Sequence, residues 1–97
     1  MPTYISLIKY TQKGLEDIKH SPDRVEVVRK AARQAGGDLK AFYLTMGQYD
    51  AVSIVESPND ETMARSALAA AMRGTVHTET FRAFTEDEFK KIVASLP

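Results

Sequence analysis

Four runs along the chain are rich in β-branched and aromatic residues, the composition that favours strands. Between them lie segments in which apolar residues recur at helical spacing. The predicted strands are Tyr4–Tyr10, Leu39–Met46, Tyr49–Glu56 and Val76–Phe84. The predicted helical stripes are Val25, Val28, Ala32 and Ala35, and then Met63, Ala64, Ala67, Leu68, Ala71 and Met72. The pattern therefore predicts the order strand, helix, strand, strand, helix, strand.

Local signals mark the ends of the predicted helices. Ser21-Pro22-Asp23 is typical of a helix start in which Ser21 is the cap, and Gly36-Gly37 is typical of a helix end. Ser57-Pro58-Asn59-Asp60 repeats the start signal, and Gly74 ends the second helix. Thr85-Glu86-Asp87-Glu88 is a capping-box pattern, which predicts a short terminal helix with Phe89, Ile92, Val93 and Leu96 on its apolar side.

Two connections remain between these elements. We expect Thr11–His20 to be a loop that holds one helical turn. Gly47-Gln48 is predicted to be a tight hairpin connection between the second and third strands, because glycine adopts positive φ without strain.

The order of the elements predicts an α+β fold. A β-α-β-β-α-β chain with a helix at its C-terminus has the split βαβ, or ferredoxin-like, arrangement. We expect residues 1–97 to form a single domain, since a chain of 97 residues is a common size for one. The shared helix-start and helix-end signals of the two halves are too general to indicate a duplication.

Both faces of the predicted sheet are apolar. Ile5 and Leu7 oppose Ile8 in the first strand, and Val52 and Ile54 oppose Ala51 and Val55 in the third. The predicted second strand places Phe42, Leu44 and Met46 opposite Leu39, Ala41 and Tyr43. Two helices cover one face of such a sheet, and an apolar face of this size is rarely left exposed. We therefore predict a homodimer through the helix-free face; the alternative is that the terminal helix folds over this face.

Composition limits the classes of function. Thirteen basic and thirteen acidic residues balance, without the basic excess typical of nucleic-acid binders. The chain has no cysteine and no apolar run long enough to cross a bilayer. Met1-Pro2-Thr3-Tyr4 has no basic region followed by an apolar run, so we expect no signal peptide. We therefore expect a cytoplasmic protein that binds neither nucleic acid nor membrane.

Topology gathers several polar and aromatic residues at one end of the sheet. The first strand ends there at Tyr10, the fourth begins there at Val76 and His77, and the Gly47–Asp50 turn lies at the same end. Arg24, at the start of the first helix, belongs to the same end. Polar groups beside an apolar interior are typical of small-molecule sites. We expect Tyr10, Arg24, Tyr49, Asp50 and His77 to line a ligand site there.

Each of these residues also has a structural interpretation. Asp50 is either a base or ligand contact, or a turn residue that accepts backbone N–H groups or pairs with Arg24 or a lysine. Tyr49 is either a packed ring with a bonded hydroxyl or a catalytic group. His77 is either a general base or a strand histidine held by a neighbour. Gly47 is conformational.

No common cofactor or metal motif is present. His77 and Glu79 fall on one side of a strand, but no second histidine lies near to complete a zinc site. Nucleotide-binding and hydrolase glycine motifs are absent. We expect no metal and no cofactor.

Three short motifs indicate a family. Gly47-Gln48-Tyr49-Asp50, together with Thr11-Gln12-Lys13-Gly14 and Ser21-Pro22-Asp23-Arg24, resembles the GYD domain family over nearly the whole chain. The resemblance implies a bacterial or archaeal protein of the dimeric α/β barrel type whose molecular function is not established. It implies that Gly47, Tyr49 and Asp50 are the residues of the family motif.

Three functions fit these observations. The first is a small homodimer that binds an organic ligand, an anionic one included, between sheet and helices. The second is an enzyme without metal or cofactor, related by fold to oxygenases and isomerases, in which His77 or Asp50 removes a proton. The third is a structural or regulatory interaction module.

Overall fold

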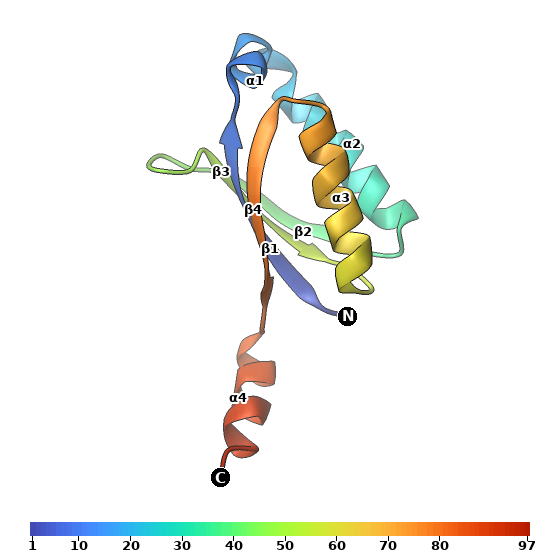
Figure 1. Ribbon diagram of the computed structural model, residues 1–97, viewed down its shortest axis with the longest axis vertical. Coiled ribbons are helices and arrows are strands. Elements are labelled where there is room, and N and C mark those ends of the chain that lie inside the picture. Colours follow the sequence, from blue (N-terminus) through green and yellow to red (C-terminus); the bar gives the residue numbers. More distant parts are fainter.

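Four antiparallel strands form one sheet in the order β2-β3-β1-β4, which confirms the ferredoxin-like prediction. The computed structural model describes residues 1–97 (Figure 1). The strands are β1 (Thr3–Tyr10), β2 (Asp38–Leu44), β3 (Ala51–Glu56) and β4 (Val76–Ala83). The helices are α1 (Gln12–Glu16), the 3-10 helix η1 (Ile18–His20), α2 (Ser21–Gln34), α3 (Asp60–Met72) and α4 (Glu86–Ala94).

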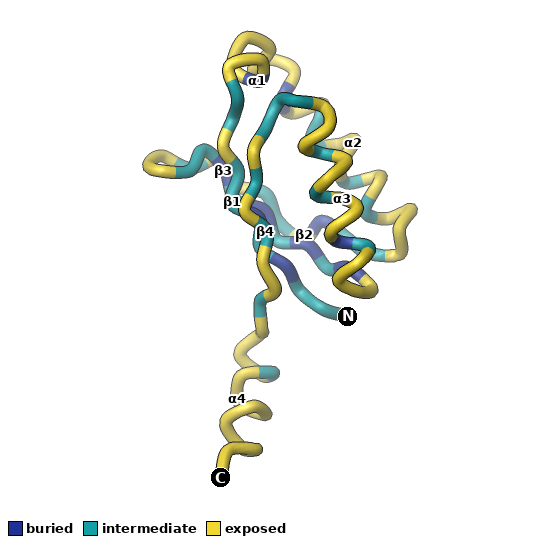
Figure 2. The backbone as a smooth tube through the Cα atoms, viewed as in Figure 1, coloured by how far each residue is buried: buried dark blue, intermediate teal, exposed yellow.

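Helices α2 and α3 lie on the same face of the sheet (Figure 1). The core between them consists of Tyr4, Leu39, Val55 and Met63, with Val25 packed against it. It is small, because 10 of 97 residues are buried and most of the chain is exposed or half-buried (Figure 2). A single copy of the chain therefore shields only part of its apolar surface.

The start of α2 differs from the prediction. The helix begins at Ser21 itself, with His20 as the N-cap residue and no side-chain cap. The Ser21 side chain is buried, and its hydroxyl lies 2.8 Å from the Tyr10 hydroxyl. The Ser21 hydroxyl therefore links α2 to β1 through Tyr10. The prediction that Ser21 caps the helix was wrong.

The other helix signals act as predicted, except that the cap of α3 is Asn59 and not Ser57, the first residue of the start signal. The Asn59 side chain accepts a hydrogen bond from the Thr62 N–H and caps α3. Thr85 and Glu88 form the predicted capping box before α4. Gly36 and Gly74 adopt φ of 87° and 76° just after α2 and α3, as the glycine end signals require.

A β-bulge changes the faces of β2. Leu39 pairs with Val55 and Ala41 pairs with Ile54, so Lys40 has no partner on β3. The extra residue places Leu39 on the helix-covered face together with Phe42. The prediction that Leu39 shares a face with Ala41 and Tyr43 was wrong, because strict alternation does not allow for a bulge.

Helix α3 is rotated from the predicted apolar stripe. Met63, Ala67 and Ala70 face the sheet side, as spacings of four and three residues require. Leu68 and Met72 point outward, with exposed fractions of 67% and 86%. These two residues were predicted to be core, and they instead form an exposed apolar stripe on the outside of the helix.

Helix α4 extends away from the sheet and covers neither face (Figure 1). Its apolar residues are exposed, namely Phe89, Ile92, Val93 and Leu96. The alternative that the terminal helix folds over the helix-free face was therefore wrong. No helix combines the length and apolar character needed to cross a membrane.

The connection between β2 and β3 is a loop of residues 45–50 and not the predicted tight hairpin. It is closed by a hydrogen bond from the Thr45 N–H to the Asp50 carbonyl, at 2.9 Å. Gly47 adopts φ of 144° with no other atom near its missing Cβ, so only its backbone conformation requires glycine. The predicted conformational role of Gly47 fits this geometry.

Asp50 joins this loop to the end of β1. Its N–H donates to the Ile8 carbonyl at 2.8 Å, and its Oδ2 accepts from the Tyr10 N–H at 2.9 Å. The carboxylate thus takes the place of a strand carbonyl where the β3 ladder stops. A backbone N–H of this kind requires an acceptor when it is partly buried.

The Thr11–Gly14 motif fastens the other side of the same end. The Thr11 hydroxyl donates to the Gly74 carbonyl at 2.6 Å and accepts from the Gly14 N–H at 3.1 Å. A Cβ on Gly14 would lie 2.1 Å from the Thr75 carbonyl oxygen. Glycine is required here because the two loops touch backbone to backbone.

We predict that Asp50→Ala destabilises the protein, because it leaves the Tyr10 N–H without its acceptor. The expected loss is about 1–3 kcal/mol of unfolding free energy. Asp50→Asn is the matched control, since its side-chain carbonyl still accepts, and it should lose less than half as much. Urea unfolding followed by circular dichroism at one fixed protein concentration measures both. Equal losses for the two variants would contradict this role of Asp50.

Candidate functional site

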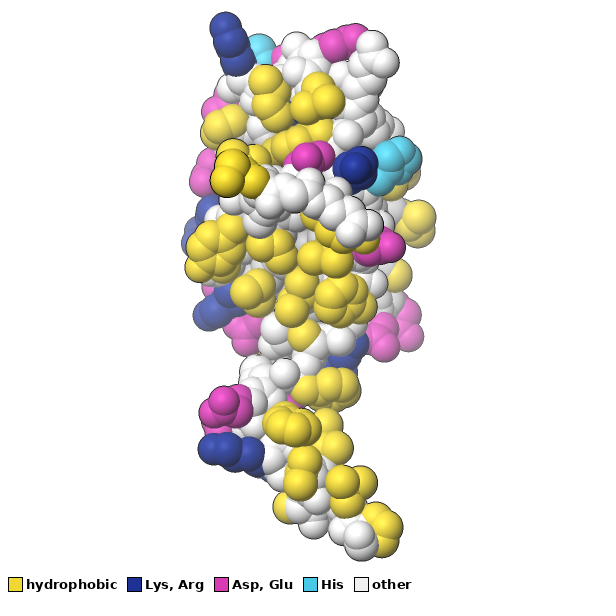
Figure 3. Space-filling model, turned by 90° about the vertical axis from the view of Figure 1, so that its left-hand side faces the viewer, with side chains coloured by type: hydrophobic (Ala, Val, Ile, Leu, Met, Phe, Trp, Pro, Cys, Tyr) yellow, Lys and Arg dark blue, Asp and Glu magenta, His cyan; other side chains and the backbone are white.

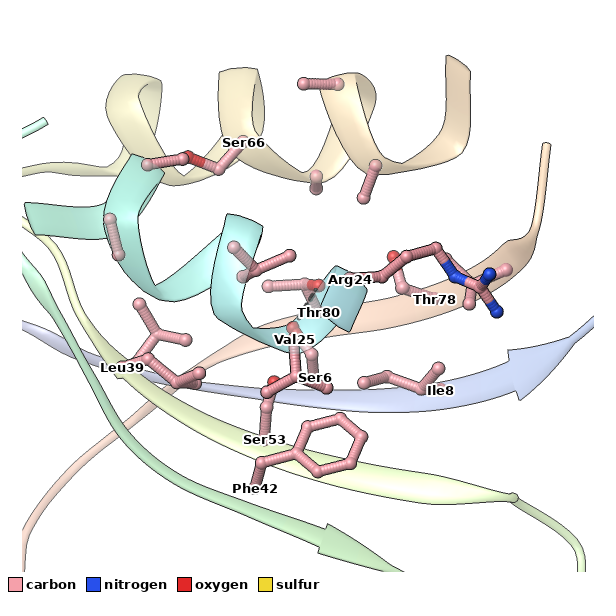
Figure 4. A pocket seen from close by; sticks show the side chains of 18 of the residues that line it. Ser6, Ile8, Arg24, Val25, Leu39, Phe42, Ser53, Ser66, Thr78 and Thr80 are labelled. Atoms are coloured by element: carbon pink, nitrogen blue, oxygen red, sulfur yellow. Dashed lines mark hydrogen bonds between the residues drawn. The ribbon is translucent and has the colours of Figure 1, made fainter. Parts of the chain in front are cut away.

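A cavity of about 350 Å³ lies between the sheet and helices α2 and α3 (Figure 4). Its apolar wall includes Val25 and Val28 of α2, Leu39 and Phe42 of β2, and Met63 of α3. Serine and threonine side chains of the sheet form its floor, namely Ser6, Ser53, Thr78 and Thr80. A mostly apolar chamber with a few polar groups is the usual form of a small-molecule site.

Two of the five predicted ligand residues line this cavity, Tyr10 and Arg24. The Tyr10 hydroxyl and Ser21 Oγ form a hydrogen bond at one end of it. The Arg24 side chain reaches from the first turn of α2 toward the part of the cavity where Thr78 lies (Figure 4). The topological expectation that the end of β1 and the start of α2 meet at one site holds for this pair.

Tyr49, Asp50 and His77 are not among the residues that line the cavity. The Asp50 carboxylate is engaged with the Tyr10 N–H, as described above, and does not pair with Arg24. His77 is exposed and lies on the opposite face of β4 from Thr78. The sheet thus brings Asp50 next to Tyr10, whereas His77 pairs with Lys9 and points away from the cavity.

Tyr49 is bound to a neighbouring strand. Its hydroxyl donates a hydrogen bond to the Glu79 carboxylate of β4. This bond raises the pKa of Tyr49 above its usual value, because the carboxylate favours the protonated phenol. The Tyr49 hydroxyl is therefore a donor at neutral pH, which agrees with the packed-ring interpretation and not with a catalytic base.

Arg24 is held by Asp17, a residue that the sequence analysis did not single out. Arg24 Nη1 donates to Asp17 Oδ2 at 3.1 Å and to the Asp17 carbonyl at 3.2 Å. Asp17 Oδ1 also lies 2.5 Å from His20 Nδ1. The hydrogen bond with His20, followed by the charges of His20 and Arg24, lowers the pKa of Asp17 below its usual value.

The sequence analysis also missed the polar floor of the cavity. Ser6 and Ser53 are buried, and Ser6 Oγ lies 2.7 Å from Thr80 Oγ1. The signal was present in the strands, where small hydroxyl residues occupy positions that face the helices. Serine at a buried strand position removes apolar volume, and the space that this leaves contributes to the cavity.

The helix-free face of the sheet is the second surface of interest. Apolar side chains cover much of it and continue along α4 (Figure 3). Its apolar strand residues alternate with the cavity-lining positions, namely Ile5, Leu7, Ala41, Tyr43, Val52, Ile54 and Phe81, and the polar residues Lys9, His77 and Glu79 lie on the same face. No group of three or more His, Cys, Asp or Glu side chains is placed to hold a metal ion on either face.

Comparisons with known proteins give a family and a fold. A relative from Thermus thermophilus, named glutamine synthetase and cystathionine beta-lyase binding protein, is 39% identical over 84 residues, which are 86% of this chain and 88% of the relative. The crystal structure of TTHA0845 from the same organism matches with a TM-score of 0.54 at 23% identity, over 88% of this chain and 95% of that one. The family model described as GYD domain matches residues 4–93. The chain therefore belongs to the GYD domain family.

Proposed function

We propose that the protein is a homodimeric interaction module, a single domain of residues 1–97 whose copies associate through the helix-free face of the sheet. The observation that carries this proposal is the uncovered apolar face of the sheet. Both helices of the βαβ units lie on the other face, and α4 extends away (Figure 1). An apolar face of this extent is typical of an interaction surface.

A second copy is the occupant that fits this face best. The chain carries no net charge, so two copies do not repel each other through their total charge. A two-fold axis through the centre of the face would bring Leu7 and Val52, which are paired neighbours on β1 and β3, against the same pair of the partner. The exposed apolar residues of α4 would extend the buried area.

The relative's name supports a protein partner as well. That relative is named as a binding protein for glutamine synthetase and cystathionine beta-lyase. We propose that this protein likewise binds a metabolic enzyme, with glutamine synthetase as the first candidate. The outward stripe of Leu68 and Met72 on α3 remains free in the proposed dimer and supplies an exposed apolar contact.

Ligand binding in the cavity is a second proposed function, which is compatible with the first. It is supported by the 350 Å³ volume, which lies within the range of about 300–1,000 Å³ common for ligand pockets. The enzyme hypothesis has less support, because the proposed bases, His77 and Asp50, do not line the cavity and the Asp50 carboxylate has a structural partner.

We predict that Val52→Glu converts the dimer to a monomer, because it places two carboxylates in the apolar interface with no partner for either charge. The expected effect is an increase of at least about a hundredfold in the dimer dissociation constant, since an unpaired buried charge costs roughly 3 kcal/mol or more. Size-exclusion chromatography with light scattering measures the mass.

Leu68→Glu is the matched control for this change. It places the same acid on the outer side of α3, where the side chain is already exposed. The control should remain dimeric, and circular dichroism should show that both variants keep their secondary structure. A folded, fully dimeric Val52→Glu protein would refute the proposed interface.

We further predict that the unaltered protein binds a glutamine synthetase from the same source and that Leu68→Glu weakens this binding. The expected loss is about tenfold or more, since one well-packed apolar contact contributes roughly 1.4 kcal/mol or more. Biolayer interferometry with immobilised enzyme measures both affinities. Failure of the unaltered protein to bind would contradict the proposed partner, and equal binding of the variant would contradict the proposed contact.

A further inference from the structure

We infer that the cavity selects an organic carboxylate, with the anionic group of the ligand at Arg24 and its apolar body between α2, α3 and the sheet. This inference rests on the proposed ligand-binding function and goes further, because it names the chemical class of the ligand and the group that anchors it. It depends on three features of the cavity: the charge of its lining, the state of Arg24, and the pairing of its other polar groups.

The lining of the cavity has positive charge and no negative charge. It includes Arg24, Arg65 and Arg73, and none of its residues is Asp or Glu. Arg65 and Arg73 are exposed residues of α3 and its C-terminal end, at the edge of the cavity, whereas the Arg24 side chain is 23% exposed. A lining of this kind attracts anions and disfavours cations.

Arg24 has hydrogen-bonding capacity to spare. Asp17 accepts hydrogen bonds from Nη1 alone. Arg24 Nη2 is shielded from solvent and has no hydrogen-bond partner. A buried donor without an acceptor costs free energy, and a hydrogen bond to a charged group is among the stronger ones. A ligand carboxylate that displaces the groups shielding Nη2 and accepts from it would remove this cost.

Asp17 does not take the place of such a ligand. Its carboxylate is 54% exposed and is shared with His20, so solvent screens part of its charge. Asp17 also fixes the orientation of the Arg24 guanidinium, because its carbonyl oxygen and its Oδ2 both accept hydrogen bonds from Nη1. Asp17 is therefore a positioning residue for Arg24.

Four of the hydroxyl groups that line the cavity are already paired with each other. Ser6 bonds with Thr80, and Tyr10 bonds with Ser21. Arg24 Nη2 is the one solvent-shielded side-chain nitrogen or oxygen that has no partner. Arg24 thus offers a ligand a charge-assisted hydrogen bond, and one anionic group of the ligand matches it. The apolar wall of Val25, Val28 and Phe42 fits a hydrocarbon or aromatic body.

The inference is tested with three probes that share one hydrocarbon chain: octanoate, 1-octanol and octylammonium. Titrations are followed by nuclear magnetic resonance of the backbone amides of the full-length protein. We expect octanoate to bind about ten- to hundredfold more tightly than 1-octanol, the range that one charge-assisted hydrogen bond supplies. Octylammonium should bind most weakly. Shifted amides should include Val25 and Thr80.

Arg24→Gln should lower the affinity for octanoate to that for 1-octanol and leave the affinity for 1-octanol unchanged. Arg33→Gln is the matched control, because Arg33 lies on the same helix outside the cavity and is 67% exposed. It should bind all three probes as the unaltered protein does. If Arg24→Gln does not fold, the order of the three probes on the unaltered protein still decides whether the cavity prefers an anion.

Three outcomes overturn parts of the account in distinguishable ways. Equal affinities for octanoate and 1-octanol, or an Arg24→Gln protein that retains the preference, would overturn the carboxylate inference and leave ligand binding in place. Shifts confined to Leu7 and Val52 would place the probes on the helix-free face and overturn both. Absence of binding by all three probes would likewise overturn both, and would not affect the proposed dimer.

Discussion

The structure depends on a sheet whose own helices cover one face and leave the largely apolar other face uncovered. Burial of apolar surface is the main favourable contribution to folding, and a chain of this size buries relatively little of it alone. Ten buried residues and a core of four large side chains illustrate this limit. The helix-free face holds Ile5, Leu7, Val52 and Ile54, residues that favour strands and also favour a dry environment. In the proposed dimer, a second copy of the chain would cover this face and add to the buried apolar surface.

The two faces of the sheet then have separate roles. In the proposed dimer the helix-free face provides association, and the helix-covered face encloses the cavity with its hydroxyl floor. Successive side chains of a strand point to opposite faces of the sheet, so Ser6 lines the cavity while its neighbour Leu7 lies on the helix-free face. The GYD motif touches one of these surfaces. Asp50 secures the loop at the end of β1, and Tyr49 bonds to Glu79, which lies on the helix-free face beside Leu7.

Much of the fold was predictable because it follows from periodicity and caps. The strand order needed only the sequence of elements, and the capping box at Thr85 fixed the start of α4. The bulge at Lys40 was not predictable, since a strand pattern carries no mark of an unpaired residue. The role of Ser21 was also hidden, because a serine before proline is a common cap and only tertiary contact with Tyr10 makes it a core residue. Topology brought Tyr10 and Arg24 to one end of the sheet, where both line the cavity, but the partner of Arg24 came from a loop whose conformation the sequence did not specify.

The most direct test is a search for contacts between copies in a mixture of isotope-labelled and unlabelled protein. Isotope-filtered nuclear Overhauser spectra report only pairs of protons that lie on different copies. The account predicts intermolecular signals from the side chains of Leu7, Val52 and Ile54 on the helix-free face. An absence of such signals at concentrations where the protein is folded, or signals confined to α2 and α3, would contradict it.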